Sequence, residues 1–546
     1  RRRRAAYAVA AAAALLAAAV AVAVVVLARR PAPAWRPAIV ELQPQVDEDS
    51  DAPSVSPDGR LLAFASDAEQ PEHYRIYVQP IGGGPRRALT RPDQAIAHSS
   101  VRWARDGAAV LAIDTGHGNA IVRVPVAGGA QEVDFAGPAF GVDDCGGRLA
   151  VVAAPPDCPG CSALEVVAPG QPPRELAREA PGPRVGWLRC DPAGTRAVYV
   201  ERAGYTMSAD VWMISLADGA RLRLTDDGAN NLDPVFTADG RAVLFTSTRG
   251  GPANLWELPL AGGAPHPITT GAGPDLGPAP TPDGRRLLFD VDVTSVHLVA
   301  WQGGVRRALT TEVREIVSGP AASPDGVHLA AVRTDGAAPH IVLLDLRTGD
   351  LRVAADGDHA GFSPDARELV YTTLAPPRVV AMPVAGGVSR VLAELSGPVE
   401  GFAIGGDARV HLSLERERRE AWSVGLAGGD LRRDGEPPVA LVVPGPAGRR
   451  FELRCPDLRA CEARVEPGEV SLPAVAGAWT SDGALYYCAH ADLFRLDVRP
   501  GAAGVTTPLA TGCRMGFALS PDGATIYTGE YSGHVRRMTI TNFGER

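Results

Sequence analysis

The chain has 546 residues, 45% of them hydrophobic and 21% charged, so it can bury more than one core and disorder is excluded as its main state. Its 63 acidic residues outnumber its 54 basic ones, all of them arginine, and the net charge of −9 argues against a nucleic-acid partner. The 61 glycines and 48 prolines are too many for a protein of long helices and favour short strands joined by tight turns.

The first predicted element is a membrane-spanning helix, Ala5–Ala28. Its uncharged residues would form a helix about 36 Å long, enough to cross a hydrocarbon core of roughly 30 Å. Arg1–Arg4 precede this run and three arginines follow it, which favours a cytoplasmic N-side. A cleaved signal peptide is the alternative, because Ala32–Ala34 resembles a cleavage site, but a signal core usually has only about 7–15 residues. We therefore expect residues 1–36 to be a single-pass anchor and short linker in a bacterial inner membrane.

The chain begins with arginine rather than methionine, which favours an anchor placed inside a longer protein. We expect a cytoplasmic module before the anchor and the rest of this chain on the periplasmic, extracytoplasmic side. The anchor would then connect the two parts.

A four-residue turn motif recurs from residue 56 onward. Ser56–Gly59 reads Ser-Pro-Asp-Gly, and with serine or threonine in first place it returns in three further complete copies and in several variants. Counting degenerate copies near Gly147, Ala408 and Gly448, there are twelve motifs spaced by about 42 residues, the repeat length of a four-stranded propeller blade. The turn residues assigned in this way are Pro57, Asp58, Gly59, Asp239, Gly240, Pro282, Asp283, Gly284, Pro324, Asp325, Gly326, Pro521, Asp522 and Gly523.

Each motif predicts a tight turn between strands. Proline presets φ, aspartate bonds the local backbone, and glycine accepts a positive φ. After the first copy come an alternating strand over residues 61–66, a strand with an aromatic residue over 75–78, a Gly-Gly turn and a short strand over 86–90. Four such strands make one blade, and because a single blade cannot cover both of its faces, blades must stack around an axis.

This unit resembles the TolB-type, WD40-like propeller repeat called PD40, and it is similar to blades of tricorn and dipeptidyl-peptidase propellers. The resemblance covers about residues 38–546. It implies an all-β fold of tandem β-propellers after the anchor, with about twelve four-stranded blades. We expect two six-bladed propellers, residues 37–312 and 313–546, with a division into seven and five blades as the alternative.

The two ends of the repeat region are predicted to meet and to close a propeller. The last repeat ends after a strand over residues 535–540, which we assign as its third. Residues 38–43 precede the first repeat and form a spare strand. This spare strand can supply a missing outer strand, which would bring both ends of the region into one propeller and remove an exposed edge.

Eight cysteines follow the anchor in two clusters, an even number that predicts disulfides in an oxidising compartment. The C-x-x-C at Cys158–Cys161 also permits a zinc site completed by Cys145 and Cys190, or a redox motif, although a redox motif needs a βαβ context that this pattern lacks. Spacing does not fix the connectivity. The simplest pairs are Cys158 with Cys161, Cys145 with Cys190, Cys455 with Cys461 and Cys488 with Cys513.

A search for catalytic motifs finds no G-x-S-x-G nucleophile elbow, no H-E-x-x-H, no P-loop and no kinase signature. We therefore expect no catalytic residue, no metal and no cofactor in this chain. Asp51, Asp233 and Asp275 each lie shortly before a turn motif and are predicted to line the mouth of a propeller, where a ligand would bind. Hydrogen bonding between blades is the alternative role for these three residues.

The sequence thus predicts a non-catalytic, extracytoplasmic β-propeller module that binds a protein or a small ligand. The architecture resembles the membrane anchor and sensor half of bacterial Ser/Thr protein kinases, which implies a kinase domain before residue 1 and a role in signalling. One alternative is a TolB-like periplasmic scaffold for envelope integrity or transport. Another is the propeller module of a hydrolase whose catalytic domain is absent from this chain.

Overall fold

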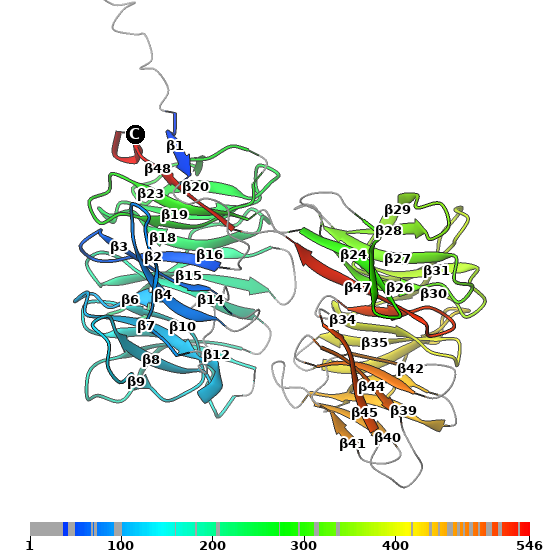
Figure 1. Ribbon diagram of the computed structural model, residues 1–546. Coiled ribbons are helices and arrows are strands. Elements are labelled where there is room, and N and C mark those ends of the chain that lie inside the picture. Colours follow the sequence, from blue (N-terminus) through cyan, green and yellow to red (C-terminus); the bar gives the residue numbers. More distant parts are fainter. Residues whose placement is uncertain are drawn as a thin grey trace, which may run out of the picture.

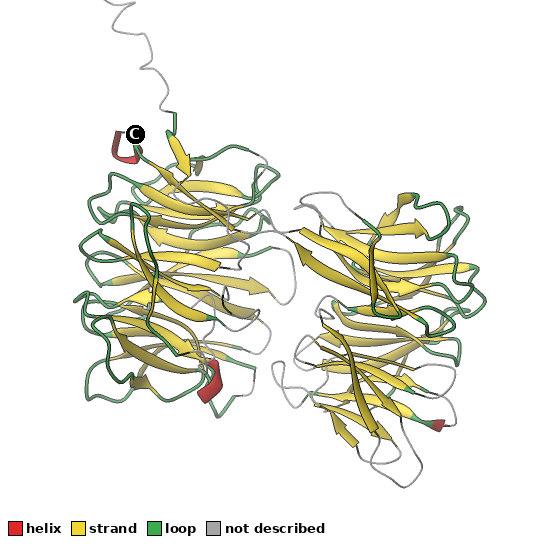
Figure 2. Cartoon of the chain, viewed as in Figure 1, coloured by secondary structure: helices red, strands yellow, loops and turns green. Residues whose placement is uncertain are grey.

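The structure is a computed structural model in which strands dominate (Figure 2). The predicted anchor, Ala5–Ala28, lies outside the described residues. No helix in the described part of the chain is long and apolar enough to cross a membrane. The described residues are 36–41, 50–66, 69, 74–91, 101–158, 160–180, 183–203, 208–271, 273–292, 295–310, 316–334, 339–415, 419–435, 439–445, 448–455, 462–466, 470–472, 476–479, 484–489, 492–497, 505–511, 516–532 and 535–545.

Six four-stranded antiparallel sheets form a first propeller, which Figure 1 shows from the side. The first strand of each sheet lies innermost, because these six strands line the cavity on the axis. In five sheets the strands follow chain order, as the repeat predicts. The sixth sheet is completed by strands from the two ends of the chain. The sheets are β2 (Ser50–Val55), β3 (Leu61–Ser66), β4 (Arg75–Pro80) and β5 (Arg87–Ala88); β6 (Arg102–Trp103), β7 (Ala109–Asp114), β8 (Ala120–Pro125) and β9 (Glu132–Phe135); β10 (Ala139–Asp144), β11 (Leu149–Ala153), β12 (Ser162–Val167) and β13 (Arg174–Glu179); β14 (Pro183–Cys190), β15 (Arg196–Ala203), β16 (Asp210–Ser215) and β17 (Arg221–Arg223); β18 (Asn231–Phe236), β19 (Ala242–Ser247), β20 (Asn254–Pro259) and β21 (His266–Pro267); and β22 (Asp275–Pro280), β23 (Leu287–Asp292), β48 (Val535–Ile540) and β1 (Ile39–Glu41).

A second propeller is built in the same way from six further sets of four strands, so the division of the twelve blades is six and six. Its closing blade also joins distant parts of the chain, and one parallel bridge links that blade to its neighbour. The sets are β26 (Ile316–Ala322), β27 (His328–Thr334), β28 (His340–Asp345) and β29 (Leu351–Asp356); β30 (His359–Phe362), β31 (Glu368–Leu374), β32 (Pro377–Pro383) and β33 (Arg390–Glu394); β34 (Val399–Ile404), β35 (Arg409–Glu415), β36 (Arg419–Gly425) and β37 (Arg432–Arg433); β38 (Val439–Pro444), β39 (Arg450–Arg454), β40 (Glu462–Glu466) and β41 (Val470–Leu472); β42 (Ala476–Trp479), β43 (Leu485–Ala489), β44 (Asp492–Asp497) and β45 (Val505–Thr511); and β46 (Phe517–Leu519), β47 (Thr525–Ser532), β24 (Ser295–Gln302) and β25 (Val305–Ala308).

The chain crosses between the two propellers twice (Figure 1). It leaves the first propeller after β23 and enters the closing blade of the second through β24, which pairs with β47 along its whole length. At the other end it leaves β47 and returns to the first propeller as β48, which pairs with β23. These pairings divide the chain differently from the expected boundary at residues 312 and 313. Residues 295–308 belong by pairing to the second propeller, and residues 535–540 to the first.

The predicted pairing between the two ends of the repeat region is confirmed, because β1 pairs antiparallel with β48. The assignment of residues 535–540 as the third strand of the last repeat is wrong, because that place is taken by β24. β48 is instead the third strand of the blade that begins with β22. A bidentate ion pair fixes it there: Arg537 donates to both oxygens of Asp290 on β23, at 2.9 and 3.2 Å, and both side chains are 4% exposed.

The turn motif forms the same hydrogen bonds in every complete copy. In Ser56–Gly59 the Ser56 hydroxyl donates to Asp58 at 2.6 Å, and Asp58 also accepts from the amide of Arg60. Glycine at the fourth position has φ near +70°, which costs a residue without a Cβ little. The hydroxyl bond is the main reason that the pKa of each turn aspartate lies below its ordinary value. The aspartates concerned are Asp58, Asp239, Asp283, Asp325, Asp365 and Asp522.

A second repeated bond holds the outer strand of several blades. A threonine just after the outer strand accepts, through its hydroxyl, the amide of the third strand at 2.9–3.0 Å. This bond takes the place of a backbone hydrogen bond beyond the end of the outer strand. A short outer strand is therefore enough to satisfy the exposed edge of the third strand. The threonines are Thr90, Thr225, Thr269 and Thr310.

Candidate functional site

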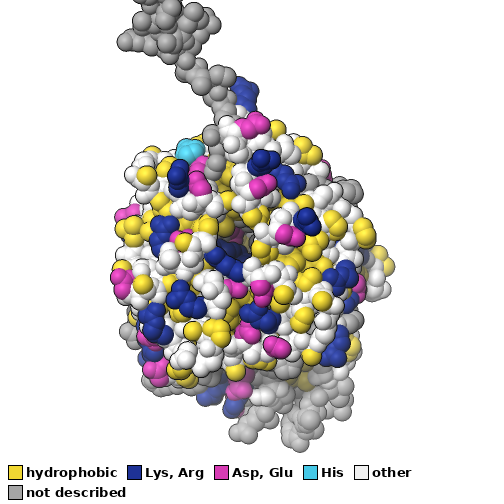
Figure 3. All heavy atoms as spheres, turned by 90° about the vertical axis from the view of Figure 1, so that its left-hand side faces the viewer, with side chains coloured by type: hydrophobic (Ala, Val, Ile, Leu, Met, Phe, Trp, Pro, Cys, Tyr) yellow, Lys and Arg dark blue, Asp and Glu magenta, His cyan; other side chains and the backbone are white. Residues whose placement is uncertain are grey.

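A cavity of about 460 Å³ lies on the axis of the first propeller, at the end where the turn motifs gather. Its lining comes from the last residues of all six inner strands and from the turns that follow them. The proline of the β2–β3 turn, Pro57, is exposed and marks the mouth. Figure 3 looks onto the left-hand side of Figure 1 and shows a hollow at the centre of the ring with arginine side chains in it.

One wall of this cavity is charged and is built by three successive blades. We call it the charged arc: Arg102, Arg105, Asp143, Asp144 and Arg189. Asp143 and Asp144 end β10, and their neighbours come from β6, its turn and β14. The cavity is lined by three arginines and three aspartates. Two of the aspartates lie in the charged arc, and the third, Asp233, lies on the opposite side.

Arg105 reaches across the mouth of the cavity. Its Nε donates to the carbonyl of Asp144 at 3.1 Å, and its Nη1 and Nη2 donate to the carbonyls of Pro192 and Asp191 at 2.5 Å. The side chain starts in the second blade and ends at the turn of the fourth. It can do so because the β10–β11 hairpin closes on Gly146 and Gly147 alone and lacks the longer turn motif.

The opposite wall is apolar and rich in proline. We call it the apolar arc: Pro53, Val55, Val235, Phe236, Pro278, Ala279 and Pro280. The inner strands of these blades are irregular at their prolines, where the pairing of β18 with β19 and of β22 with β23 shifts register. Such bulges change the direction of the side chains beside them.

Asp143 is a carboxylate of the cavity with a raised pKa. Burial raises that pKa to about 6, against the opposing effect of two backbone bonds and of Arg102 and Arg105. The amides of Asp144 and Cys190 donate to its two oxygens at 3.0 and 2.7 Å. The side chain therefore lies deep in the protein, partly accessible from the cavity, and carries a proton in mildly acidic solution.

A disulfide ties the charged arc together. Cys145, directly after β10, is bonded to Cys190 at the end of β14, so neighbouring blades are covalently joined beside the cavity. Cys158 is bonded to Cys161 in the loop before β12. These two bonds join the cysteines named above as the simplest pairs of the first cluster. Cys455 and Cys488 are disulfide-bonded too, while Cys461 and Cys513 lie outside the described residues.

The three aspartates predicted to line a propeller mouth occupy different positions in their strands. Asp233 does line the cavity, in a left-handed conformation with φ of 51°, and it accepts the amide of Gly277 in the next blade. Asp275 is 9% exposed at the start of β22 and is not among the lining residues. Asp51 lies on β2, and its side chain is outside the described part.

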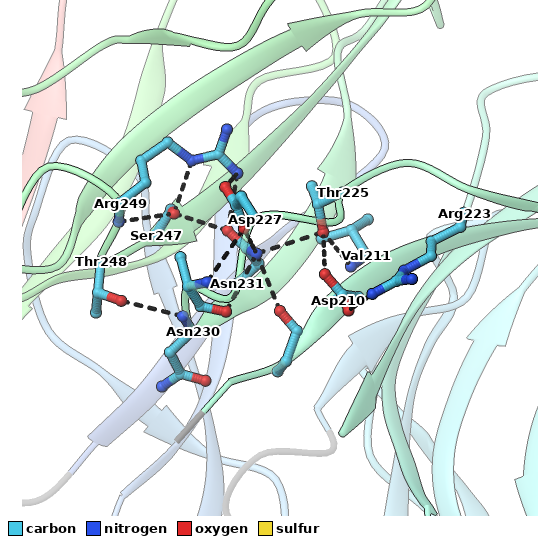
Figure 4. A network of polar contacts seen from close by, with 12 residues as sticks. Asp210, Val211, Arg223, Thr225, Asp227, Asn230, Asn231, Ser247, Thr248 and Arg249 are labelled. Carbon is cyan, nitrogen blue, oxygen red and sulfur yellow. Dashed lines mark hydrogen bonds and ion pairs between the residues drawn. The ribbon is translucent and has the colours of Figure 1, made fainter. Parts of the chain in front are cut away.

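Asn231 occupies the position in β18 that Asp275 occupies in β22, and it shows what this end of an inner strand does (Figure 4). Its side-chain amide donates to the carbonyl of Ala209 in the neighbouring blade at 3.0 Å and to Asp227 at 3.0 Å. Its oxygen accepts from Ser247 at 2.7 Å and from Arg249. This network joins blades, which is the alternative role considered above for the inner-strand aspartates.

The geometry of the cavity offers no pair of nucleophile and base. None of its lining residues is a histidine, and its hydroxyls are engaged in the turns or with backbone, as Thr281 is with Asp283. A buried histidine does occur in the second propeller, where His411 lies 3.1–3.2 Å from Asp407 and Asp434. Ser423 donates to Asp434 rather than to His411, so this group is not arranged as a catalytic triad.

The charged arc contains the site residues that the motif search missed. They lie in or beside the degenerate repeats, where Pro-Asp is absent and the turn motif gives no guide. Aligning the twelve repeats on their turns would mark Arg102, Asp143 and Arg189 as ends of inner strands. At the shortened hairpin around Gly146, however, no Pro-Asp motif is present to fix the alignment.

No family model matches the chain, and no curated protein matches it. Among solved structures, the chain is similar to a putative TolB from Agrobacterium tumefaciens at 18% identity, over 63% of this chain and 97% of that one, with a TM-score of 0.27. The tricorn protease matches at 12% identity over 86% of this chain and 53% of that chain, with a TM-score of 0.33. A GH74 enzyme from Niastella koreensis matches at 9% identity over 90% of each chain, with a TM-score of 0.37. These TM-scores are too low to support an assignment, so the propeller assignment rests on the strand pairings.

Proposed function

We propose that this chain is a non-catalytic binding module whose first propeller takes a ligand in its central cavity. The observation that carries the proposal is the cavity itself, about 460 Å³ in volume and lined by all six inner strands. This volume lies within the range of roughly 300–1,000 Å³ typical of small-molecule sites. The walls combine apolar surface with a few polar groups held by disulfide and backbone bonds, which suits binding and orientation rather than bond making.

We further propose that the module belongs to a membrane-anchored sensor. Residues 5–28 would hold the module at a bacterial inner membrane, and the propellers would lie outside the cytoplasm, as their disulfides favour. The chain is held to the first propeller ten residues after Ala28, because the Ala38 amide donates to Asn542 at 2.8 Å and the Ala38 carbonyl accepts the amide of Thr541 at 3.0 Å. A cytoplasmic effector such as a Ser/Thr kinase would then receive the signal. The partner outside the cytoplasm is an unidentified protein or small ligand.

Affinity selection with mass spectrometry tests the binding role. The full chain is incubated with a metabolite library, and retained compounds are compared between the natural protein and Val235→Trp, which adds a large side chain to the cavity wall. Val133, 61% exposed on β9 of the same propeller, provides the matched control Val133→Trp. We expect at least one compound to be retained by the natural chain and by the control but lost with Val235→Trp. Equal retention by all three proteins would contradict the proposal.

A further inference from the structure

The cavity of the first propeller has unequal walls, and their chemistry narrows the class of ligand. The charged arc comes from three consecutive blades, and the apolar arc from the other three. A ligand seated between them meets arginine donors on one side and proline and valine on the other, where Asp233 also lies and accepts the amide of Gly277. Burying an apolar group against the second wall is favourable by roughly 25 cal/mol per Å² of surface removed from water.

The carboxylates of the charged arc are already committed to the fold. Asp143 accepts the amides of Asp144 and Cys190. Asp144 accepts the amides of Arg105 and Gly147, at 2.9 and 2.8 Å. These acids therefore hold the backbone of neighbouring blades in place, and they are poorly available to a cationic ligand.

The guanidinium of Arg189 is differently placed. It donates one bond, at 2.8 Å, to the carbonyl of its own neighbour Leu188, and it forms no ion pair with a carboxylate in the described part of the chain. A guanidinium has five N–H donors in a planar fork that matches a carboxylate or sulfonate. Arg105 likewise donates to carbonyls rather than to carboxylates. Arg102 and Arg105 act on the Asp143 carboxylate, whereas Arg189 keeps donors that an anionic ligand can use.

From these contacts we infer that the cavity takes a small amphipathic anion, a molecule with an apolar body and one carboxylate or sulfonate group. The anionic group lies at Arg189, and the apolar body lies on Val55, Val235 and Pro280, the partly exposed residues of the apolar arc. This inference rests on the proposed function, because it names the ligand class of the same cavity. The size of the cavity fits a single small molecule, and the lining is confined to the turn-motif end of the inner strands.

Two fluorescent probes that differ in charge test the inference. Anilinonaphthalene sulfonate is a small amphipathic anion, and phenylnaphthylamine has the same aromatic body without the sulfonate. Both are titrated into the full chain, and the site is defined as the fluorescence lost in Val235→Trp. Arg189→Gln should weaken the sulfonate probe about tenfold, as the loss of a charge-assisted bond implies, and change the neutral probe less than twofold. Arg241→Gln is the matched control, because Arg241 is 88% exposed on the same face and outside the cavity.

The outcomes separate this inference from the proposed function. If Val235→Trp removes the signal of both probes while Arg189→Gln has no more effect than Arg241→Gln, the anion assignment is overturned and binding in the cavity stands. If Val235→Trp changes neither probe, both fail. A tenfold loss with Arg189→Gln that Arg189→Lys partly restores supports an anion held by positive charge at that position.

Discussion

Asp143 shows how a single side chain links the cavity to pH. Its pKa is raised to about 6, above the value of about 3.9 expected for an unfolded chain. Between these two values the folded protein holds a proton that the unfolded chain has lost, so this group makes stability fall as the pH rises from about 4 to 6. Asp143→Asn should remove that part of the pH dependence, because the amide cannot ionise.

Thermal unfolding midpoints measured from pH 4 to pH 7.5 check this expectation. The loss of stability contributed as the pH rises from about 4 to 6 should be absent in Asp143→Asn, so its midpoint should fall less over this range than that of the natural chain. Asp283→Asn is the control, because the pKa of Asp283 is lowered by its bond from Thr281, so its stabilising charge is lost only below about pH 4. Parallel profiles for Asp143→Asn and the natural chain would contradict the assignment of this carboxyl.

Ala366 occupies a turn position that glycine fills in the complete copies of the motif. Its φ is 59°, in the left-handed region where a Cβ costs roughly 1 kcal/mol. Ala366→Gly should therefore stabilise the second propeller by about 0.5–1 kcal/mol, after the greater freedom of glycine in the unfolded chain is counted. Urea unfolding measures the change, and Ala330→Gly, on β27 away from any turn, should destabilise. A loss of stability with Ala366→Gly would show that this turn does not carry the strain.

At the scale of the element, the blades are held together unevenly around the first propeller. The Cys145–Cys190 bond closes a loop with a sequence separation of 45 residues, whereas the Cys158–Cys161 bond closes one of 3. Replacing both cysteines of the first pair by serine should cost about 2–4 kcal/mol, and replacing the second pair should cost less, because the longer loop constrains the unfolded chain more. Urea unfolding and the proteolysis rate near residue 145 measure the difference. Equal effects of the two replacements would contradict this argument.

The turns and strands were largely predictable from sequence, and the cavity was not. Ser-Pro-Asp-Gly determines a local hairpin by its own bonds, as the Ser56–Asp58 contact shows, so each copy marks a strand pair. Arg105 and Asp144 act through partners 39 to 87 residues away, in other blades. Such contacts depend on how blades meet around the axis, and no local pattern encodes them. Asp233 was found because it shortly precedes a recognisable variant of the motif, Thr237–Gly240.

On the scale of the whole molecule, pairing between distant segments closes both propellers. The count of twelve blades followed from the spacing of the turns, but the exchange of strands between propellers did not, because β24 and β48 have the same alternating pattern as any third strand. The pattern of a strand determines which face is buried and leaves the choice of partner open. The assignment of residues 535–540 to the last repeat failed for this reason.

The Arg537–Asp290 ion pair should contribute much of the stability of the blade that closes the first propeller. Arg537→Ala leaves the Asp290 carboxylate buried without this ion pair, and it removes the guanidinium that lies 4.7 Å from the centre of the Phe64 ring. Removing one partner of a buried pair costs about 3–5 kcal/mol. Arg306 and Glu530 also join distant strands, but their side chains are 44% and 35% exposed, so Arg306→Ala should cost no more than about 1 kcal/mol. Urea unfolding of the full chain compares the two variants, and similar costs would contradict the difference in burial.

The return of β48 to the first propeller has a consequence for biosynthesis. When a ribosome has made residues up to 292, five blades of that propeller are complete and the sixth has only β22 and β23. The nascent chain must then wait for the whole second propeller before residues 535–540 arrive to cover the open edge of β23. During that interval an unpaired strand edge is exposed to other chains, so we expect chaperone dependence and misassembly to concentrate at this blade.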